Sequence, residues 1–559
     1  MPALQRPWNL SDAASVQFGA TNLGDQPAVL FAVMDGQRWS DTCAVLEPAE
    51  TVTVVVPLFR FKLPPLMAAR FPQMNGAPGG AMTLWTGAGG GTGSNAQCHS
   101  ELTLSLGAAG VPAQPLSLSG LRWTPWNHSL GNGVPSPLSD AVYPFVDQFG
   151  QSKISDWPRK IHTGADFALR RSDEEKDLAA HPGPSDWSVF GGDTSKPALA
   201  ATGHFRTQKV DDRWWLVDPQ GYRFFSHGID CVGAPGGTST VGSVRSKFFE
   251  AVPPGSDFRT ANLRAKYGPG YVNASAVLIH KRLRSWGVNT IGNWANPSVF
   301  LPERPQRTSY VIGVNYHWPG KQTSPTDFVN DPQFAPAVHA ALQAWADKGV
   351  DADPYLLGVF VDNELHSFNE NETVAEIYFS TVHDAMRALL PHKLYLGCRL
   401  DYHFWPNDGS KAAVRAAAKY ADVVSFNHYR YTAEQLRPPA SGSSEEEWDA
   451  PVIIGEYHFG ALDRGPFHTG LRSVGSQEQR ARTYELFMRT ALANEYLVGA
   501  HWFAYSDEPT TGRGDGENYQ IGFVDEADTP YGETVNAARK VGAMLYSAGA
   551  NCTGSFAGE

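Results

Sequence analysis

The stretch LLGVFVDNE, residues Leu356–Glu364, is a short apolar run that ends abruptly in three polar residues. An apolar run without polar alternation is typical of a parallel strand that is buried on both faces. The stretch PVIIGEYHFG, residues Pro451–Gly460, has the same design and carries Glu456 directly after its apolar part. The two stretches predict a parallel sheet whose strands end in polar groups.

Six further apolar runs of this kind surround these two, namely YRFFSHGID, NTIGNW, SYVIGVNY, LYLGCRL, DVVSFNHY and LVGAHWFAYSD. Most of the intervening segments have helical periodicity, at about Leu278–Trp286, Phe334–Asp347, Ala375–Leu390, Ala412–Tyr420, Gln477–Ala493 and Glu533–Ala548. Eight buried strands that alternate with helices are the pattern of an α/β fold of the (β/α)8 TIM-barrel type. We therefore expect a barrel in the second part of the chain.

The N-terminal part has a different rhythm. From Ser15 to about Leu121, short alternating runs such as SVQFGATN and TVTVVVPL are separated by Gly, Pro and Asn. This pattern predicts an antiparallel β-sandwich. We expect a β-sandwich over residues 1–145, a connector with a β-hairpin over residues 146–220, and a catalytic barrel over residues 221–559.

Composition restricts the partners of the chain. Of its 559 residues, 57 are acidic and 45 are Lys or Arg, so the formal charge is −12 and a nucleic-acid partner is not expected. No signal peptide is visible, and no uninterrupted apolar run reaches the roughly 18 residues of a membrane span. We expect no membrane partner and a location in the cytoplasm, or outside it after removal of a leader; a homo-oligomer remains open. Five scattered cysteines indicate neither a zinc site nor a disulfide framework, so no metal or cofactor is predicted.

Two glutamates carry the functional prediction. Side chains at the carboxyl ends of barrel strands converge on one face, and Glu364 on strand four lies across that face from Glu456 on strand seven. A carboxylate that follows an apolar run is costly unless it is paired or lies in a cleft. Cleavage of a glycosidic bond requires two carboxyl groups beside one linkage, about 5 to 5.5 Å apart when the configuration is retained. The pair therefore predicts a glycosidase.

The other strand ends supply candidate substrate-binding residues. Aromatic rings can stack on sugar faces, and polar side chains can bind sugar hydroxyls. Each candidate also has an ordinary explanation as a packed core residue or as a structural partner of a carboxylate. The candidates are Asp230, Asn293, Trp294, Trp318, Asn363, Arg399, His403, His428, Tyr429 and Trp502.

These motifs resemble a known group of enzymes. Asn363–Glu364 and Glu456 are similar to the paired motifs of clan A of the retaining glycoside hydrolases. The segments VDQFGQSKISDWPRKIHT, DDRWWLVDPQGYRFFSHGID and RLRSWGVNTIGNW resemble glycoside hydrolase family 50, the β-agarases. The resemblance implies that Glu364 is the acid/base, that Glu456 is the nucleophile and that Asn363 binds the sugar 2-hydroxyl. It also implies a sandwich similar to a carbohydrate-binding module.

The resemblance implies an oligosaccharide or polysaccharide substrate with β-linked galactose. The long segments Cys231–Tyr271 and DEPTTGRGDGENYQ favour a walled site and therefore action on chain ends. Other clan A glycosidases and transglycosylases share the same catalytic residues and remain alternatives. Two further classes are weighed: a metal-dependent barrel hydrolase, although SHGID lacks a His-x-His pair, and a non-catalytic sugar-binding protein, which would lack a carboxylate. The sequence leaves the exact sugar and linkage open.

Overall fold

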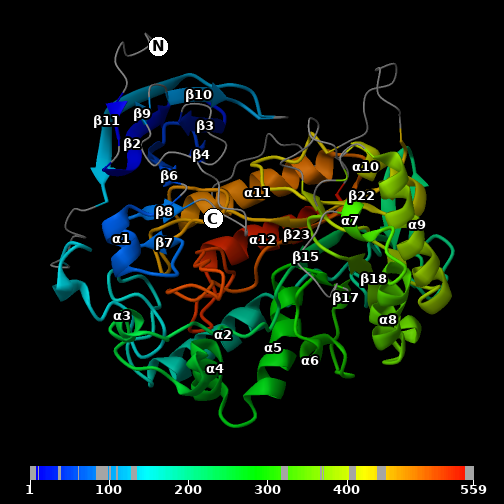
Figure 1. The fold of residues 1–559 in the computed structure, drawn as a ribbon. Helices are drawn as coiled ribbons and strands as arrows, with labels where there is room; N and C mark the ends of the chain where they lie inside the picture. Colours follow the sequence, from blue (N-terminus) through cyan, green and yellow to red (C-terminus); the bar gives the residue numbers. More distant parts are fainter. Residues whose placement is uncertain are drawn as a thin grey trace.

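We describe a computed structural model of the chain. The structure describes residues 8–10, 12–34, 40–60, 62–83, 98–99, 102–108, 111–126, 135–315, 325–365, 368, 371–401, 411–436 and 448–547. Figure 1 shows two regions, a small set of N-terminal sheets and a larger region in which helices surround a curled sheet. Among the described residues, no helix combines the length and the apolar character needed to cross a bilayer.

The curled sheet has nine parallel strands in the order β19-β18-β17-β16-β15-β23-β22-β21-β20. Their bounds are β15 Ser226–Ile229, β16 Thr290–Ile291, β17 Ser309–Val314, β18 Leu356–Val361, β19 Leu394–Tyr395, β20 Leu400–Asp401, β21 Val424–Asn427, β22 Val452–Tyr457 and β23 Leu497–Trp502. All eight predicted strands are present in this sheet. Mixed α/β architecture with a curled parallel sheet is thus confirmed.

One predicted strand, LYLGCRL, differs from expectation because it is split in two. Its first part, β19, pairs with β18, and its last part, β20, pairs with β21. Gly397 and Arg399 between them have φ angles of 75° and 50°, which no regular strand accommodates. The two edge strands of the sheet are therefore separated in the chain only by residues 396–399.

Helices follow most of the strands and cover the outside of the sheet (Figure 1). The principal ones are α5 Tyr271–Ser285, α8 Phe334–Ala346, α9 Glu372–Leu389, α10 Lys411–Tyr420, α11 Gln477–Ala493 and α12 Gly532–Met544, and shorter ones are α3 Ser243–Ser246, α4 Phe258–Tyr267, α6 Pro297–Phe300 and α7 Pro325–Phe328. In α9 the buried residues Val374, Tyr378, Val382 and Met386 recur every four positions, as one helical face requires. The predicted helical periodicity is confirmed in each of the six principal helices.

Two antiparallel three-stranded sheets form most of the N-terminal region, in the orders β11-β2-β5 and β10-β3-β4. The strands are β2 Ala13–Asn22, β3 Ala28–Met34, β4 Asp41–Leu46, β5 Thr51–Pro57, β10 Leu102–Leu106 and β11 Leu116–Pro125; β1 Trp8–Asn9 pairs with β9 Cys98–His99. Phe18 of β2, Leu30 of β3, Leu46 of β4 and Val56 of β5 belong to one apolar core. Side chains from both sheets therefore contribute to one shared apolar core.

The N-terminal region is fixed to the curled sheet by polar contacts. Asp41 of β4 receives hydrogen bonds from Arg472 at 3.0 Å and from the Tyr431 hydroxyl at 3.0 Å. The Val45 backbone N–H donates to Gln479 Oε1 of α11 at 2.8 Å. Because these contacts are buried, the two regions pack as one body in this part of the molecule.

A second junction lies beside the carboxyl edge of the curled sheet. It contains α1 Pro65–Arg70 and the small sheet β6-β8-β7, with bounds β6 Phe59–Arg60, β7 Gly76–Ala77 and β8 Ala81–Thr83. The Gly76 backbone exchanges two 2.8 Å hydrogen bonds with the Asn518 side chain, and His468 Nε2 lies 2.8 Å from the Thr83 carbonyl oxygen. N-terminal residues therefore contact the loops that follow β22 and β23.

The connector closes the opposite end of the curled sheet. It contains α2 Asp166–Ala180 and the antiparallel sheet β12 Arg206–Val210, β13 Arg213–Val217 and β14 Arg223–Phe224. Leu216 and Phe224 share one apolar cluster with Leu357, Val423 and Val498, which begin strands of the curled sheet. The amino ends of the strands are thereby covered, and the carboxyl edge is left for function.

Candidate active site

The carboxyl edge of the curled sheet gathers a set of polar and aromatic side chains. Asp230 follows β15, Trp294 follows β16, Glu364 follows β18, and Glu456 lies in β22. Asn427 ends β21, and Arg399 precedes β20. Contacts between these side chains connect the strand ends in one site.

Glu456 is held by contacts from three different strand ends. The Tyr429 hydroxyl donates a hydrogen bond to Oε2 at 2.6 Å, and the Trp294 indole N–H donates to Oε1 at 3.2 Å. Arg399 Nη1 lies 3.1 Å from the same Oε1. Glu456 is only 6% exposed, so these contacts replace water as partners of its charge. Two hydrogen-bond donors and a cation therefore fix the orientation of this carboxyl group.

Glu364 has different surroundings. It is half-buried, and Asn427 Nδ2 donates to its Oε1 at 2.9 Å. Burial raises the pKa of Glu364 to about 8, and the charges of Glu456 and Asp401 add to this rise. Glu364 therefore holds a proton at neutral pH, as a general acid must.

Asn427 connects the two residues at the end of β18. Its Nδ2 donates to Glu364 Oε1 and, at 3.1 Å, to Asn363 Oδ1. Since the Asn363 oxygen accepts this bond, its own amide N–H groups are left as donors. Asn427 was not among the sequence candidates, because DVVSFNHY offers three polar or aromatic residues at its end and does not show which of them point inward.

Arg399 is buried among side chains from several strands and lies next to Glu456. Its guanidinium lies 4.7 Å from the centre of the Trp294 ring and 5.5 Å from that of Phe360. A Cβ atom on Gly455 would lie 2.4 Å from Arg399 Cδ, so only glycine leaves room for this side chain. Arg399 is fully buried, and among the described residues its one ion pair is with Glu456.

The backbone at the strand ends has unusual conformations. Trp294, Asp362, Glu364 and Arg399 have φ angles of 59°, 64°, 51° and 50°. Residues other than glycine adopt this left-handed region at a cost of about 1 to 3 kcal/mol each, and such residues gather at functional sites. The strain is concentrated where the side chains turn from the sheet into the site.

The segment after β23 forms a wall next to these residues. Burial raises the pKa of Tyr429, and the charge of Glu517 contributes together with those of Glu456 and Glu364, so Glu517 lies near them. Arg513 contacts Glu508 at 3.0 Å and is also paired with Glu517. The segment is buried over residues 506–512 and 516–529, so it is built into the molecule.

The predicted site residues divide into three groups. Glu364, Glu456, Asn363, Trp294, Arg399 and Tyr429 are linked by the contacts above, and Asp230 and Asn293 lie just beneath them, with the Asn293 backbone N–H 2.7 Å from Asp230 Oδ1. Trp318 and His403 lie outside the described residues. Trp502 and His428 form the third group.

The structure gives Trp502 and His428 packing roles in place of the predicted contact with sugar. Trp502 is fully buried, packs edge-on against Tyr457 and Tyr484, and donates its indole N–H to the Ile521 carbonyl at 2.8 Å. His428 is fully buried, and its Nε2 lies 2.8 Å from the Thr432 carbonyl oxygen. Strand alternation explains the difference, since residues on either side of an inward-facing one point outward.

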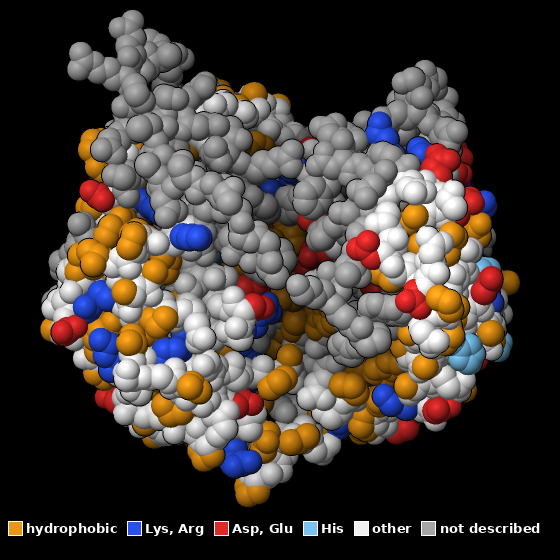
Figure 2. Space-filling model, in the orientation of Figure 1, with side chains coloured by type: hydrophobic (Ala, Val, Ile, Leu, Met, Phe, Trp, Pro, Cys, Tyr) orange, Lys and Arg blue, Asp and Glu red, His pale blue; other side chains and the backbone are white. Residues whose placement is uncertain are grey.

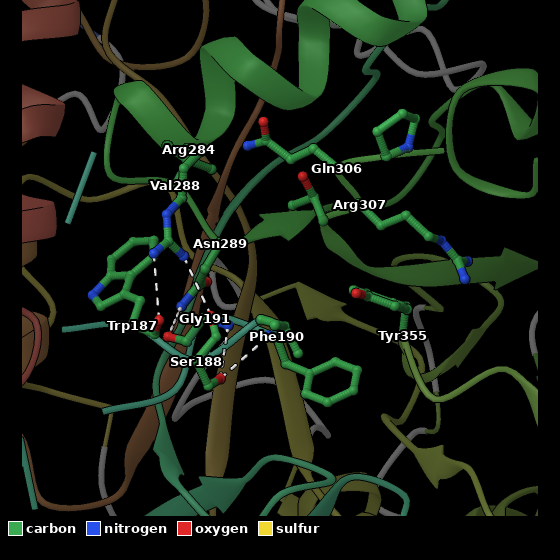
Figure 3. Close-up of a pocket in the computed structure, with 13 residues that line it drawn as sticks. Trp187, Ser188, Phe190, Gly191, Arg284, Val288, Asn289, Gln306, Arg307 and Tyr355 are labelled. Atoms are coloured by element: carbon green, nitrogen blue, oxygen red, sulfur yellow. Dashed lines mark hydrogen bonds between the residues drawn. The ribbon is translucent and has the colours of Figure 1, made fainter. Parts of the chain in front are cut away.

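The surface shows hollows at other places. Figure 2 shows a central depression in which acidic and hydrophobic side chains are visible. A separate pocket of about 300 Å³ lies at the opposite end of the sheet, lined by residues that precede β16, β17 and β18 (Figure 3). Its two arginines are engaged: Arg284 donates to the Pro184 carbonyl at 2.6 Å and covers the Trp187 ring, and Arg307 covers the Tyr355 ring. Within the described ranges, no three His, Cys, Asp or Glu side chains gather in a way that could hold a metal ion.

Comparison with known sequences finds similarity to two curated β-agarases. No family model matches the chain. The chain is 30% identical to "Beta-agarase B" and 29% identical to "Beta-agarase A", both of Vibrio sp. (strain JT0107), over 72% and 73% of its length. These matches cover 54% and 52% of the two relatives, so the chain spans about half the length of the curated relatives that it matches.

Comparison with solved structures covers nearly the whole chain. The crystal structure of an agarase, AgWH50C, is 27% identical, with a TM-score of 0.72 over 97% of this chain and 92% of that one. The structure of an exo-β-agarase is 24% identical, with a TM-score of 0.74 over 98% and 92%. The latter comparison supports the fold, and the former supports both the fold and the relationship.

Proposed function

Since the chain belongs with the β-agarases of glycoside hydrolase family 50, we propose that it is a retaining glycoside hydrolase that cleaves β-linked galactose units of agarose-type saccharides. One observation supports this most directly. Two glutamates at one edge of the sheet have different surroundings, because Glu456 is bound by two hydrogen-bond donors and one cation, whereas Glu364 has a pKa of about 8. One ionised and one protonated carboxyl group are what double displacement requires.

In the first step the Glu456 carboxylate attacks the anomeric carbon, and the proton of Glu364 passes to the departing glycosidic oxygen. Tyr429 and Trp294 hold the two oxygens of Glu456, so the attacking lone pair keeps one direction. The bond from the anomeric carbon to the leaving oxygen breaks as the bond to Glu456 forms. Asn363, whose oxygen is occupied by Asn427, offers its amide N–H groups to the sugar 2-hydroxyl.

In the second step Glu364, now ionised, takes a proton from water, and the water oxygen attacks the same carbon. The glycosyl bond to Glu456 breaks, and Glu456 becomes a carboxylate again. Loss of the negative charge on Glu456 during the first step lowers the pKa of Glu364, because that charge is one cause of its rise. Glu364 therefore becomes a base when a base is needed.

We further propose that the enzyme acts on chain ends. The wall formed by Glu508, Arg513 and Glu517 lies on one side of the catalytic pair, and Asn518 of the same segment is bonded to Gly76 of the N-terminal region. A segment that is buried and fixed on both sides resists displacement by a long polysaccharide. This arrangement supports a site that is closed at one end and releases short products.

The fold assignment that goes with this function is a closed (β/α)8 barrel over residues 221–559, with a β-sandwich over residues 1–145 and a connector over residues 146–220. The short separation between β19 and β20, with backbone bonds from residues 395–398 to both neighbouring strands, supports closure. The two N-terminal sheets that share one core support the sandwich. A sugar-binding role of the sandwich, like that of a carbohydrate-binding module, remains an expectation.

The direct test is product analysis on agarose and on even-numbered agarose-derived oligosaccharides, with β-linked glucose and uronate oligomers as controls. We expect one short product from the start of the reaction and a β-configured new end in proton NMR. A ladder of intermediate sizes would contradict action on chain ends. An initially α-configured product would contradict retention, and activity on the control oligomers alone would contradict the substrate.

A further inference from the structure

Two carboxyl groups, those of Glu456 and Asp230, lie near the buried guanidinium of Arg399, and their hydrogen-bond partners differ. Glu456 accepts hydrogen bonds from the Tyr429 hydroxyl and the Trp294 indole, and it forms an ion pair with the Arg399 guanidinium. Asp230 is fully buried and receives one hydrogen bond, from the Asn293 backbone N–H at 2.7 Å. Its Oδ2 meets no protein donor among the described residues.

The neighbouring imidazole, His501, has a protonation state that a chain of hydrogen bonds fixes. Asn289 Oδ1 accepts the His227 backbone N–H at 2.9 Å, so this atom is an acceptor and Thr290 must donate to it. Ser226 must then donate its one proton to Thr290 at 2.8 Å. The remaining contact, from Ser226 Oγ to His501 Nε2 at 2.8 Å, therefore needs the proton on Nε2.

With its proton on Nε2, His501 turns a bare nitrogen towards Asp230. Its Nδ1 lies 3.9 Å from Asp230 Oδ1. Burial lowers the pKa of His501 to about 3, and the charge of Arg399 adds to this effect, so the ring is neutral. A lone pair that faces a fully buried carboxylate gives no stabilisation, whereas the same lone pair beside a neutral carboxyl group carries no such electrostatic cost.

The charges around Asp230 also favour its neutral form. The titratable groups that face it are Arg399, Glu456 and His501 from other strands, and Cys231 from its own. Only Arg399 is positive, and its guanidinium already contacts Glu456. Burial raises the pKa of Asp230 well above its ordinary range, and the charge of Glu456 raises it further. Burying two carboxylates beside one cation costs more free energy than burying one carboxylate beside it.

We propose that Asp230 is a positioning residue that works as a neutral carboxylic acid. As a neutral group it leaves the charge of Arg399 to Glu456 alone. As an acceptor it holds the Asn293 backbone, and the next residue, Trp294, turns at φ 59° to place its indole on Glu456. The proposal rests on the proposed function only in naming Glu456 as the nucleophile.

Infrared difference spectroscopy of the wild type and D230N at pH 7 tests the protonation state. We expect D230N to lose one protonated-carboxyl C=O band that shifts in D2O. Loss of carboxylate bands instead would overturn the proposal. This readout needs no substrate, so it stands even if the proposed glycosidase activity fails.

A second measurement covers the case in which D230N does not fold. Carbon NMR of protein labelled at the aspartate carboxyl groups compares the wild type with E456Q. Removal of the Glu456 charge frees Arg399, so one aspartate should change from protonated to ionised at pH 7. The same substitution in a D230N background is the control and should show no such change. If the number of protonated aspartates is the same in E456Q and in the wild type, Glu456 and Asp230 do not compete for the charge of Arg399, and the proposal is wrong.

The positioning role is tested by comparing two variants of the same residue. D230N keeps an oxygen for the Asn293 N–H, and D230A does not. We expect kcat of D230A to be at least tenfold below that of D230N, with similar KM values, because the indole contact serves the nucleophile. Equal kcat values in two folded variants would overturn this part. If neither they nor the wild type has activity, the proposed function fails, and the infrared result still decides the state of Asp230.

Discussion

The ends of β22 and β18 carry the same side chain and place it in different surroundings. Glu456 on β22 is 6% exposed and is oriented by a hydroxyl, an indole and a guanidinium. Glu364 after β18 has one amide donor and two neighbouring carboxylates, and its pKa rises to about 8. Because the two residues are chemically identical, hydrogen-bond donors and neighbouring charges must account for the different properties of their carboxyl groups.

Replacing Glu456 should cause the largest loss of activity. E456A should lower kcat by a factor of about 10⁴ to 10⁶, because no nucleophile remains at the anomeric carbon. Azide, which fits the space left by the side chain, should restore part of the rate and give a glycosyl azide of inverted configuration. Initial rates and NMR of the products measure both effects.

A matched control for E456A is E485Q, a change in another buried glutamate, on α11, that retains acceptor atoms for Arg489. Its kcat should stay within about twofold of the wild-type value. If E456A were as active as the wild type, Glu456 would not be the nucleophile.

Replacing Glu364 should cause the second-largest loss of activity. E364Q should lower kcat by a factor of about 10² to 10⁴ on oligosaccharides, because the departing oxygen receives no proton. With an aryl glycoside that has an acidic leaving group, the loss in the first step should be much smaller. Comparing the two substrate types measures this, and an equal loss on both would argue against general-acid catalysis.

A smaller loss of activity should follow from removing one hydrogen-bond donor of Glu456, the Tyr429 hydroxyl. Y429F removes the 2.6 Å hydrogen bond to Glu456 Oε2, and we expect kcat to fall by a factor of about 10 to 10². Y431F is the control, since the Tyr431 hydroxyl bonds Asp41 and the Ser473 carbonyl. Y431F should lower stability by about 1 kcal/mol and leave kcat unchanged. A larger kcat loss in Y431F than in Y429F would contradict the assignment.

The smallest effect requires no substitution. The pKa of Glu364 is raised to about 8, so its active protonated form predominates below that pH and is lost as the pH rises through it. The value of kcat/KM should therefore fall about tenfold per pH unit above pH 8. Rates measured from pH 5 to 10 check this, and E364Q should lack the alkaline fall. An alkaline fall that persists in E364Q would assign it to another group.

Much of the architecture could be predicted because apolar runs are local. LLGVFV and PVIIG are buried strands in the structure, and the periodicity of α9 and α11 gave their positions to within a few residues. The prediction missed the split of LYLGCRL, since positive φ angles at Gly397 and Arg399 leave no mark in an apolar pattern.

The candidate site was predicted in outline, and its members only in part. Polar residues at strand ends are visible in a sequence, but the direction of each side chain is not. Asn427 was therefore missed beside His428, and Trp502 was chosen although it lies in the core. Both errors are shifts between the two faces of a strand, which one residue of register decides.

Local patterns in the amino-acid sequence were enough to predict the alternation of buried strands and helices, the antiparallel N-terminal strands and the two glutamates at strand ends. These follow from the period of apolar residues and from the cost of placing a carboxylate after a buried strand. The packing of the strands decides which donors surround each glutamate, which arginine Glu456 meets and that Asp230 lies beside the same cation. Those properties depend on distances between residues far apart in the chain, and electrostatic energy depends on distance and burial rather than on order in the sequence.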